Sequence, residues 1–163
     1  MNVFFSKLFR GDSLNFINGT KANYETVITD YVNSHNYSSK TKYFIWVDLK
    51  NFKVNIFHGS KNNWKIIHSY LCTIGKKETP TPKGTFTIGV KGLYFGTNKG
   101  YKCWYYTQFK GNYLFHSIIY NLDGSIRDGR LGKELSDGCI RLTKLNAKWI
   151  WDNVPESTKV VIS

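Results

Sequence analysis

The sequence predicts a mainly β protein, a β-sandwich of mostly antiparallel strands with an N-terminal helix and a short C-terminal helix. Three observations support this fold class. Aromatic residues make up 17% of the chain, and such side chains favour strands. Short apolar segments alternate with turns rich in glycine, asparagine, serine and threonine. At 163 residues the chain can bury a sizeable core and gives no reason to expect a second independent domain.

The first predicted element is a helix, because apolar side chains recur at helical spacing and share one face. They are Tyr24, Val27, Ile28, Tyr31 and Val32. We expect this helix to pack against the sheet and to be structural.

Six strands are expected to follow, at residues 43–49, 52–57, 64–72, 86–90, 103–109 and 113–119. The first two read as a hairpin across Lys50 and Asn51. A short helix is expected at residues 147–153, where Pro155 stops it, and residues 159–162 form a closing strand. Residues 121–132 are rich in aspartate, glycine and arginine, which predicts a surface loop.

The net charge of +12 indicates an anionic partner or anionic surroundings. Nucleic acid is not expected, because the lysines are scattered without a dense stripe and no common nucleic-acid-binding signature is present. A solvated basic surface is the alternative explanation of the charge. We expect no transmembrane segment, and residues 1–10 show no signal peptide with an uninterrupted apolar core.

The best candidate for chemistry is Cys139, which follows Gly138 directly. A thiolate is the nucleophile, so a working cysteine needs a base or a positive field that lowers its pKa from about 8.5. His116 and Arg141 are the candidates for these tasks. A glycine before the nucleophile allows a tight turn that can aim backbone N–H groups at one point, as an oxyanion site requires.

Several segments resemble the L,D-transpeptidases, the YkuD-like family. The active-site signature is matched by His116-Ser117 and by residues 136–142 (SDGCIRL). Residues 81–86 (TPKGTF) resemble the family's TPxGxF element, and residues 146–162 resemble its closing helix and strand, particularly in short clostridial-type members.

This resemblance covers the chain from about residue 40 to the C-terminus. It implies an N-terminal segment, residues 1–39, with one amphipathic helix, followed by an L,D-transpeptidase-like catalytic domain, residues 40–163. The fold that it implies is again a β-sandwich.

The resemblance also implies catalytic roles. Cys139 is the expected nucleophile and His116 the expected base. Ser117 is expected to orient the imidazole, largely through its backbone carbonyl, and Gly138 and Cys139 to supply backbone N–H groups to the oxyanion.

The expected substrate-binding residues are Arg141, Ser136 and Asp137. Arg141 either binds a substrate carboxylate or holds the loop of Asp137 or Asp128 in place. Asp137 stands where the family usually has histidine. Its carboxylate would raise the pKa of the thiol if it pointed inward, and would do little if it pointed to solvent or paired with a cation such as Arg141 or Arg130.

The implied function is that of a peptidoglycan L,D-transpeptidase, which forms a thioester with a stem peptide and passes it to an amine, giving a 3-3 cross-link. The alternatives are an L,D-carboxypeptidase, in which water takes the acyl group, amidase-like attack on another wall bond, and a wall-binding domain whose thiol is disabled by Asp137. Peptidoglycan stem peptides and the anionic cell wall are the expected partners, outside the cytoplasm. We expect a monomer and no cofactor.

The other two cysteines leave two possibilities open. A disulfide between Cys72 and Cys103 would leave Cys139 as the reactive thiol, whereas two separate buried thiols would act as small apolar residues. No metal site is expected, because no pair of cysteines has metal-ligand spacing.

Overall fold

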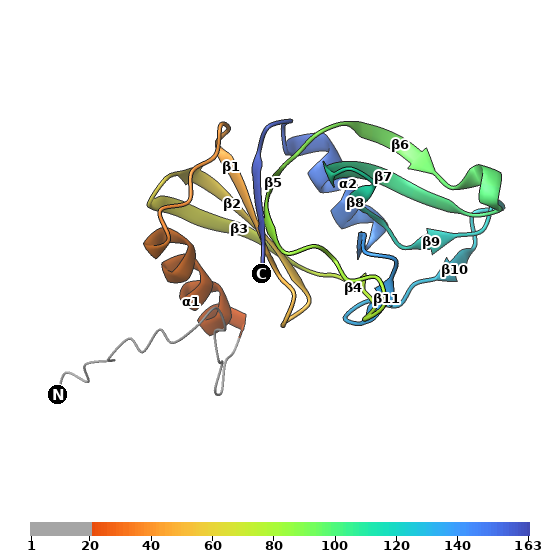
Figure 1. The fold of residues 1–163 in the computed structure, drawn as a ribbon, viewed down its shortest axis with the longest axis horizontal. Helices are drawn as coiled ribbons and strands as arrows, with labels where there is room; N and C mark the ends of the chain where they lie inside the picture. The colour runs from red at the N-terminus through yellow and green to blue at the C-terminus, as the bar shows by residue number, and fades with distance from the viewer. Residues whose placement is uncertain (1–20) are drawn as a thin grey trace.

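The structure is a computed structural model that describes residues 21–163, which form two α-helices and three sheets (Figure 1). The first sheet has five strands in the order β3-β2-β1-β13-β5. They are β1 (Tyr43–Asp48), β2 (Lys53–Ser60), β3 (Asn63–Leu71), β5 (Gly84–Thr87) and β13 (Lys159–Ile162). β1 pairs antiparallel with β2 and parallel with β13, so the last strand of the chain lies inside this sheet.

The second sheet has six strands in this part of the chain, in the order β10-β9-β7-β8-β12, with β6 also paired to β7. They are β6 (Lys91–Phe95), β7 (Lys102–Lys110), β8 (Tyr113–Ser117), β9 (Ile119–Tyr120), β10 (Ile126–Asp128) and β12 (Ile140–Leu142). A short parallel pair, β4 (Ile74–Gly75) and β11 (Glu134–Ser136), lies beside it, and a 3-10 turn, η1 (Thr97–Lys99), follows β6.

Helix α1 (Lys21–Ser34) covers the outer face of the first sheet, as Figure 1 shows. Successive side chains of a strand point to opposite faces. Phe44 and Trp46 of β1 accordingly join Ile28 and Val32 of α1 in one core, while Ile45 of β1 joins the core between the two sheets. The predicted helix therefore packs against the sheet, as expected.

Helix α2 (Lys144–Asn153) packs against β7, β8 and β12. It begins at Thr143, whose Oγ1 accepts a hydrogen bond from the Asn146 N–H at 3.1 Å. The Trp149 ring lies 6.3 Å from the Tyr43 ring and 4.3 Å from the His68 ring, so α2 also reaches the first sheet.

The predicted fold class is confirmed, with corrections of detail. Most strand pairs among the described residues are antiparallel, as expected, and three are parallel: β1 with β13, β8 with β12, and β4 with β11. The strand expected at residues 86–90 lies at Gly84–Thr87, where it pairs with β13. Part of the loop expected at residues 121–132 is strand β10, because it pairs with β9.

Candidate active site

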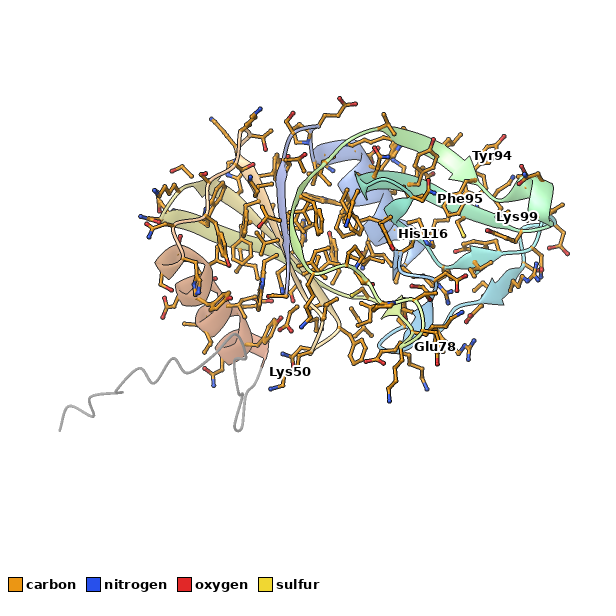
Figure 2. The ribbon with its side chains drawn as sticks, viewed as in Figure 1. Lys50, Glu78, Tyr94, Phe95, Lys99 and His116 are labelled. Atoms are coloured by element: carbon orange, nitrogen blue, oxygen red, sulfur yellow. The ribbon has the colours of Figure 1, made fainter. Side chains whose placement is uncertain are left out.

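His116 lies in β8, which pairs in parallel with β12. In this pairing Arg141 lies opposite His116. This pairing brings the histidine and the segment that follows Cys139 together from positions far apart in the sequence. His116 is only 5% exposed, and the Phe95 ring lies against it nearly at a right angle, with the ring centroids 5.1 Å apart. Figure 2 shows both side chains in the half of the molecule that holds the second sheet.

The surroundings of His116 favour a neutral imidazole. Its Nδ1 lies 2.6 Å from the Ser117 carbonyl oxygen, which can only accept, so Nδ1 carries the proton and Nε2 keeps its lone pair. Burial lowers the pKa of His116 to about 4; the Ser117 hydrogen bond opposes this and the Arg141 charge adds to it. The ring is therefore a proton acceptor at neutral pH.

The Ser117 side chain is committed to the scaffold. Its Oγ accepts from the Trp104 N–H at 2.8 Å and lies 2.7 Å from the Ile118 carbonyl oxygen, to which it donates. The Ser117 side chain thus links β7 to β8, while its backbone carbonyl accepts the hydrogen bond from His116.

Cys139 is half-buried at the turn before β12. Its Sγ lies 3.5 Å from the Asn112 carbonyl oxygen, and no hydrogen bond joins it to His116 in the described part of the chain. Burial raises the pKa of Cys139; the Leu114 N–H opposes this, and the charge of Asp137 adds a smaller increase. The thiol is therefore protonated at rest.

Gly138 lies in the left-handed region, at a φ of +112°, and a Cβ there would come within 2.5 Å of the Tyr113 ring. Its N–H donates to Ser136 Oγ at 3.1 Å, and its expected contribution to an oxyanion site stays a prediction. Ser136 Oγ in turn donates to the Cys139 carbonyl at 2.6 Å. Ser136 is 6% exposed and therefore shapes the turn from inside. Its expected part in substrate binding stays a prediction.

Asp137 points away from the thiol. Its side chain is 83% exposed, and its Oδ1 lies 2.6 Å from Lys76 Nζ. The partner is thus neither Arg141 nor Arg130, and the hydrogen bond from Lys76 lowers the pKa of Asp137. An exposed, paired carboxylate of this kind has a small effect on Cys139.

Arg141 is buried and only partly paired. Its Nη1 lies 2.9 Å from Asp128 Oδ2, and its Nε has no hydrogen-bond partner among residues 21–163. Arg130 contacts the other oxygen of Asp128 at 2.9 Å, and these hydrogen bonds hold the pKa of Asp128 well below its usual range. Arg141 therefore holds the loop of Asp128, which is one of the two roles expected for it.

Cys72 and Cys103 are both buried free thiols, the second of the two possibilities. Burial raises the pKa of each, that of Cys103 to about 12. Among the described residues, no three His, Cys, Asp or Glu side chains are grouped to hold a metal ion. Neither helix within residues 21–163 has the length and apolar character needed to cross a bilayer.

A cavity of about 650 Å³ opens between the β1–β2 turn and residues 75–83. Neither His116 nor Cys139 lines it. The candidate site is therefore the ladder of β8 and β12 with the Cys139 turn. The cavity adjoins this turn through Thr81 and Lys76, which line it and bond to Gly138 and Asp137.

A sequence profile described as the L,D-transpeptidase catalytic domain, YkuD, matches residues 42–162. The chain belongs to this L,D-transpeptidase family. YciB from Bacillus subtilis (strain 168), itself assigned only provisionally as an L,D-transpeptidase, is 37% identical in an alignment of 131 residues that covers 73% of this chain and 66% of YciB.

Solved structures share the fold of this chain. A fused zinc-dependent amidase, peptidase and peptidoglycan-binding domain-containing protein from Clostridium acetobutylicum ATCC 824 is 42% identical, with a TM-score of 0.75 over 87% of this chain and 61% of that one. An L,D-transpeptidase from Mycobacterium smegmatis, 20% identical, shares the fold with a TM-score of 0.59 over 75% of this chain and 58% of that one. The chain thus spans less than two thirds of each of these relatives.

Several contacts around the turn of residues 136–139 had no signal in the sequence. Thr81, Lys76 and Asn112 all bond to the turn, and Phe95 covers the histidine. The TPxGxF resemblance pointed to Thr81 without giving it a role. The others come from distant segments that only the fold brings together.

Proposed function

We propose that this protein is a cysteine-dependent peptidoglycan L,D-transpeptidase. It cleaves the bond between an L-centre and the terminal D-residue of a tetrapeptide stem and forms a 3-3 cross-link through a thioester on Cys139. One observation carries the proposal: a buried, neutral His116, oriented by the Ser117 carbonyl, lies beside the strand that follows the Cys139 turn. Membership of the family adds independent support.

In the proposed first step, the Cys139 thiol turns from the Asn112 carbonyl toward His116. Nε2 takes the proton, and the thiolate attacks the carbonyl carbon of the scissile bond. Hydrogen bonds of this kind are often absent in an empty enzyme and form when the substrate binds.

In the second step, the tetrahedral intermediate collapses. The S–C bond is kept, the C–N bond breaks, and His116 returns its proton to the departing D-amino acid. An amine from a second stem then attacks the thioester, loses a proton to His116, and releases the thiol. Water in place of this amine gives the carboxypeptidase product.

The Cys139 N–H is the proposed oxyanion donor. The Gly138 N–H, the other candidate, already donates to Ser136. A backbone N–H aimed at the developing oxyanion stabilises the transition state more than the ground state, which is the requirement for catalysis.

The first test is mass spectrometry of the protein and its products after incubation with a disaccharide tetrapeptide. We expect loss of the terminal D-residue and a cross-linked dimer, and we expect Cys139→Ala to lower both by at least about 10³-fold. Cys103→Ala, which removes a buried thiol, is the matched control and keeps the activity. Monomeric tripeptide alone would identify a carboxypeptidase.

A folded protein that gives no product dependent on Cys139 would overturn the proposal. The remaining alternative would then be a wall-binding domain, in which Cys139→Ala leaves the binding of purified peptidoglycan unchanged.

A further inference from the structure

We propose that Thr81 is a positioning residue for acyl transfer: its buried hydroxyl fixes the peptide unit that carries the Cys139 N–H and so aims the oxyanion donor. This inference rests on the proposed function. It concerns one hydroxyl on a segment that is far from the signature residues in sequence.

The Thr81 hydroxyl has two partners in the interior. Thr81 is 4% exposed, and its Oγ1 accepts from the Gly75 N–H at 2.9 Å while it donates to the Gly138 carbonyl at 2.9 Å. A hydroxyl has one proton to donate, and here that proton goes to the residue before the nucleophile.

The Gly138 carbonyl and the Cys139 N–H belong to the same peptide unit. That unit is planar and trans, so its C=O and N–H point in opposite directions and cannot turn independently. A hydrogen bond that holds the carbonyl toward Thr81 therefore holds the Cys139 N–H away from it. The position of the Thr81 side chain therefore sets the direction of the Cys139 N–H, the proposed oxyanion donor.

The two neighbouring peptide units are held by a different residue. Ser136 Oγ accepts from the Gly138 N–H at 3.1 Å and donates to the Cys139 carbonyl at 2.6 Å. Ser136 thus restrains the peptide units on both sides of the central one, which Thr81 restrains. Gly138 has no Cβ to limit rotation, so this central unit needs an outside restraint most.

Thr81 is itself held rigidly. Its segment folds back on Gly75 so closely that a Cβ on Gly75 would lie 2.3 Å from the Thr79 carbonyl oxygen. Gly75 also belongs to β4, which pairs with β11, and the Lys76 N–H donates to the Ser136 carbonyl at 2.9 Å. The hydroxyl is therefore presented by a segment that is fastened to the turn of residues 136–139 at several points.

The test compares two reactions of Cys139 that differ in one respect. Acylation by 4-nitrophenyl acetate passes through a tetrahedral oxyanion, whereas alkylation by iodoacetamide forms none. We expect Thr81→Val, which keeps the shape and removes the hydroxyl, to slow acylation about 10- to 100-fold, below the loss for deleting a whole oxyanion donor. Alkylation should change less than about threefold, and Thr81→Ser should restore acylation.

Thr81→Ala is the second variant, because a water molecule can enter the space left and replace the hydroxyl in part. Thermal unfolding reports whether each variant is folded. We expect Thr81→Ala to lose less acylation than Thr81→Val. Normal acylation by folded Thr81→Val, or equal loss of acylation and alkylation, would overturn the inference. If the wild-type protein reacts with the ester but not with the stem peptide, the proposed function fails while the role of Thr81 is still decided by the ester.

Discussion

The resting state of Cys139 and His116 is a neutral pair. Burial raises the pKa of the thiol and lowers that of the imidazole to about 4, so a thiolate–imidazolium pair is disfavoured in the empty site. A thiol with a raised pKa has a smaller thiolate fraction at neutral pH than an ordinary cysteine, and that fraction rises tenfold per pH unit below the pKa.

We therefore expect the rate of Cys139 alkylation by iodoacetamide to rise about tenfold per unit between pH 6 and pH 8, without a plateau. The measurement is a pH series of initial rates, read by mass spectrometry at the modified peptide. Cys72 and Cys103 serve as internal controls and stay unmodified, since both are buried. A plateau of reactivity below pH 7 would instead show an ion pair already formed in the empty enzyme.

The residues of the site differ in how far the sequence could predict them. His116 and Cys139 lie in segments that resemble the family signature, so they could be named as candidates without a structure. The partner of Asp137 could not, because Lys76 lies 61 positions away and nothing local distinguishes it from Arg130 or Arg141. The long-range contact decides that the carboxylate points outward.

Among the elements, α2 depends on a lysine from another part of the fold. Lys91, the first residue of β6, directs its Nζ to the carbonyl oxygens of Trp151 at 2.7 Å and of Val154 at the end of the helix. A cation at a helix C-terminus satisfies open carbonyls and complements the helix dipole. Burial lowers the pKa of Lys91, so part of this gain is offset by desolvation.

We expect Lys91→Met, which keeps the aliphatic stem and removes the ammonium, to lower the free energy of unfolding by about 1.5–3 kcal/mol. The matched control is Lys148→Met on the exposed face of α2, which removes a surface pair with Asp152 and should cost no more than about 0.5 kcal/mol. Urea unfolding followed by circular dichroism measures both. Equal effects would mean that Lys91 does not stabilise the helix end.

The elements that could be predicted are those with their own periodic pattern. α1 shows helical spacing, and β1, β2 and β13 are apolar runs, which is why their bounds were close. β4, β11 and β12 have two or three residues each and exist because they pair with distant segments, such as Ser136 with Gly75 and Ile140 with Phe115. Such strands have no local signal in the sequence, and they are the ones that flank the turn of residues 136–139.

For the whole molecule, the open question is whether residues 40–163 are a domain that folds alone. The family match begins at residue 42, after α1. Yet α1 covers Phe44, Trp46, Phe57 and Trp64, each no more than 4% exposed. Fully burying a large apolar side chain contributes about 1.5–3 kcal/mol, and the free energy of unfolding of a protein is typically about 5–15 kcal/mol. Exposing these side chains by removing α1 would therefore cost an amount comparable with the total free energy of unfolding.

We expect residues 40–163, produced without the N-terminal segment, to unfold at a much lower urea concentration than the full chain, or to aggregate through the bared sheet face. Two point variants of the full chain separate the loss of packing by α1 from the effect of truncation itself. Ile28→Ala removes a fully buried contact and should cost about 2–5 kcal/mol, whereas Asp30→Ala on the exposed side of α1 should change stability by less than about 0.5 kcal/mol. An unchanged midpoint for residues 40–163, with no effect of Ile28→Ala, would instead show that the catalytic domain is independent and that α1 only lies upon it.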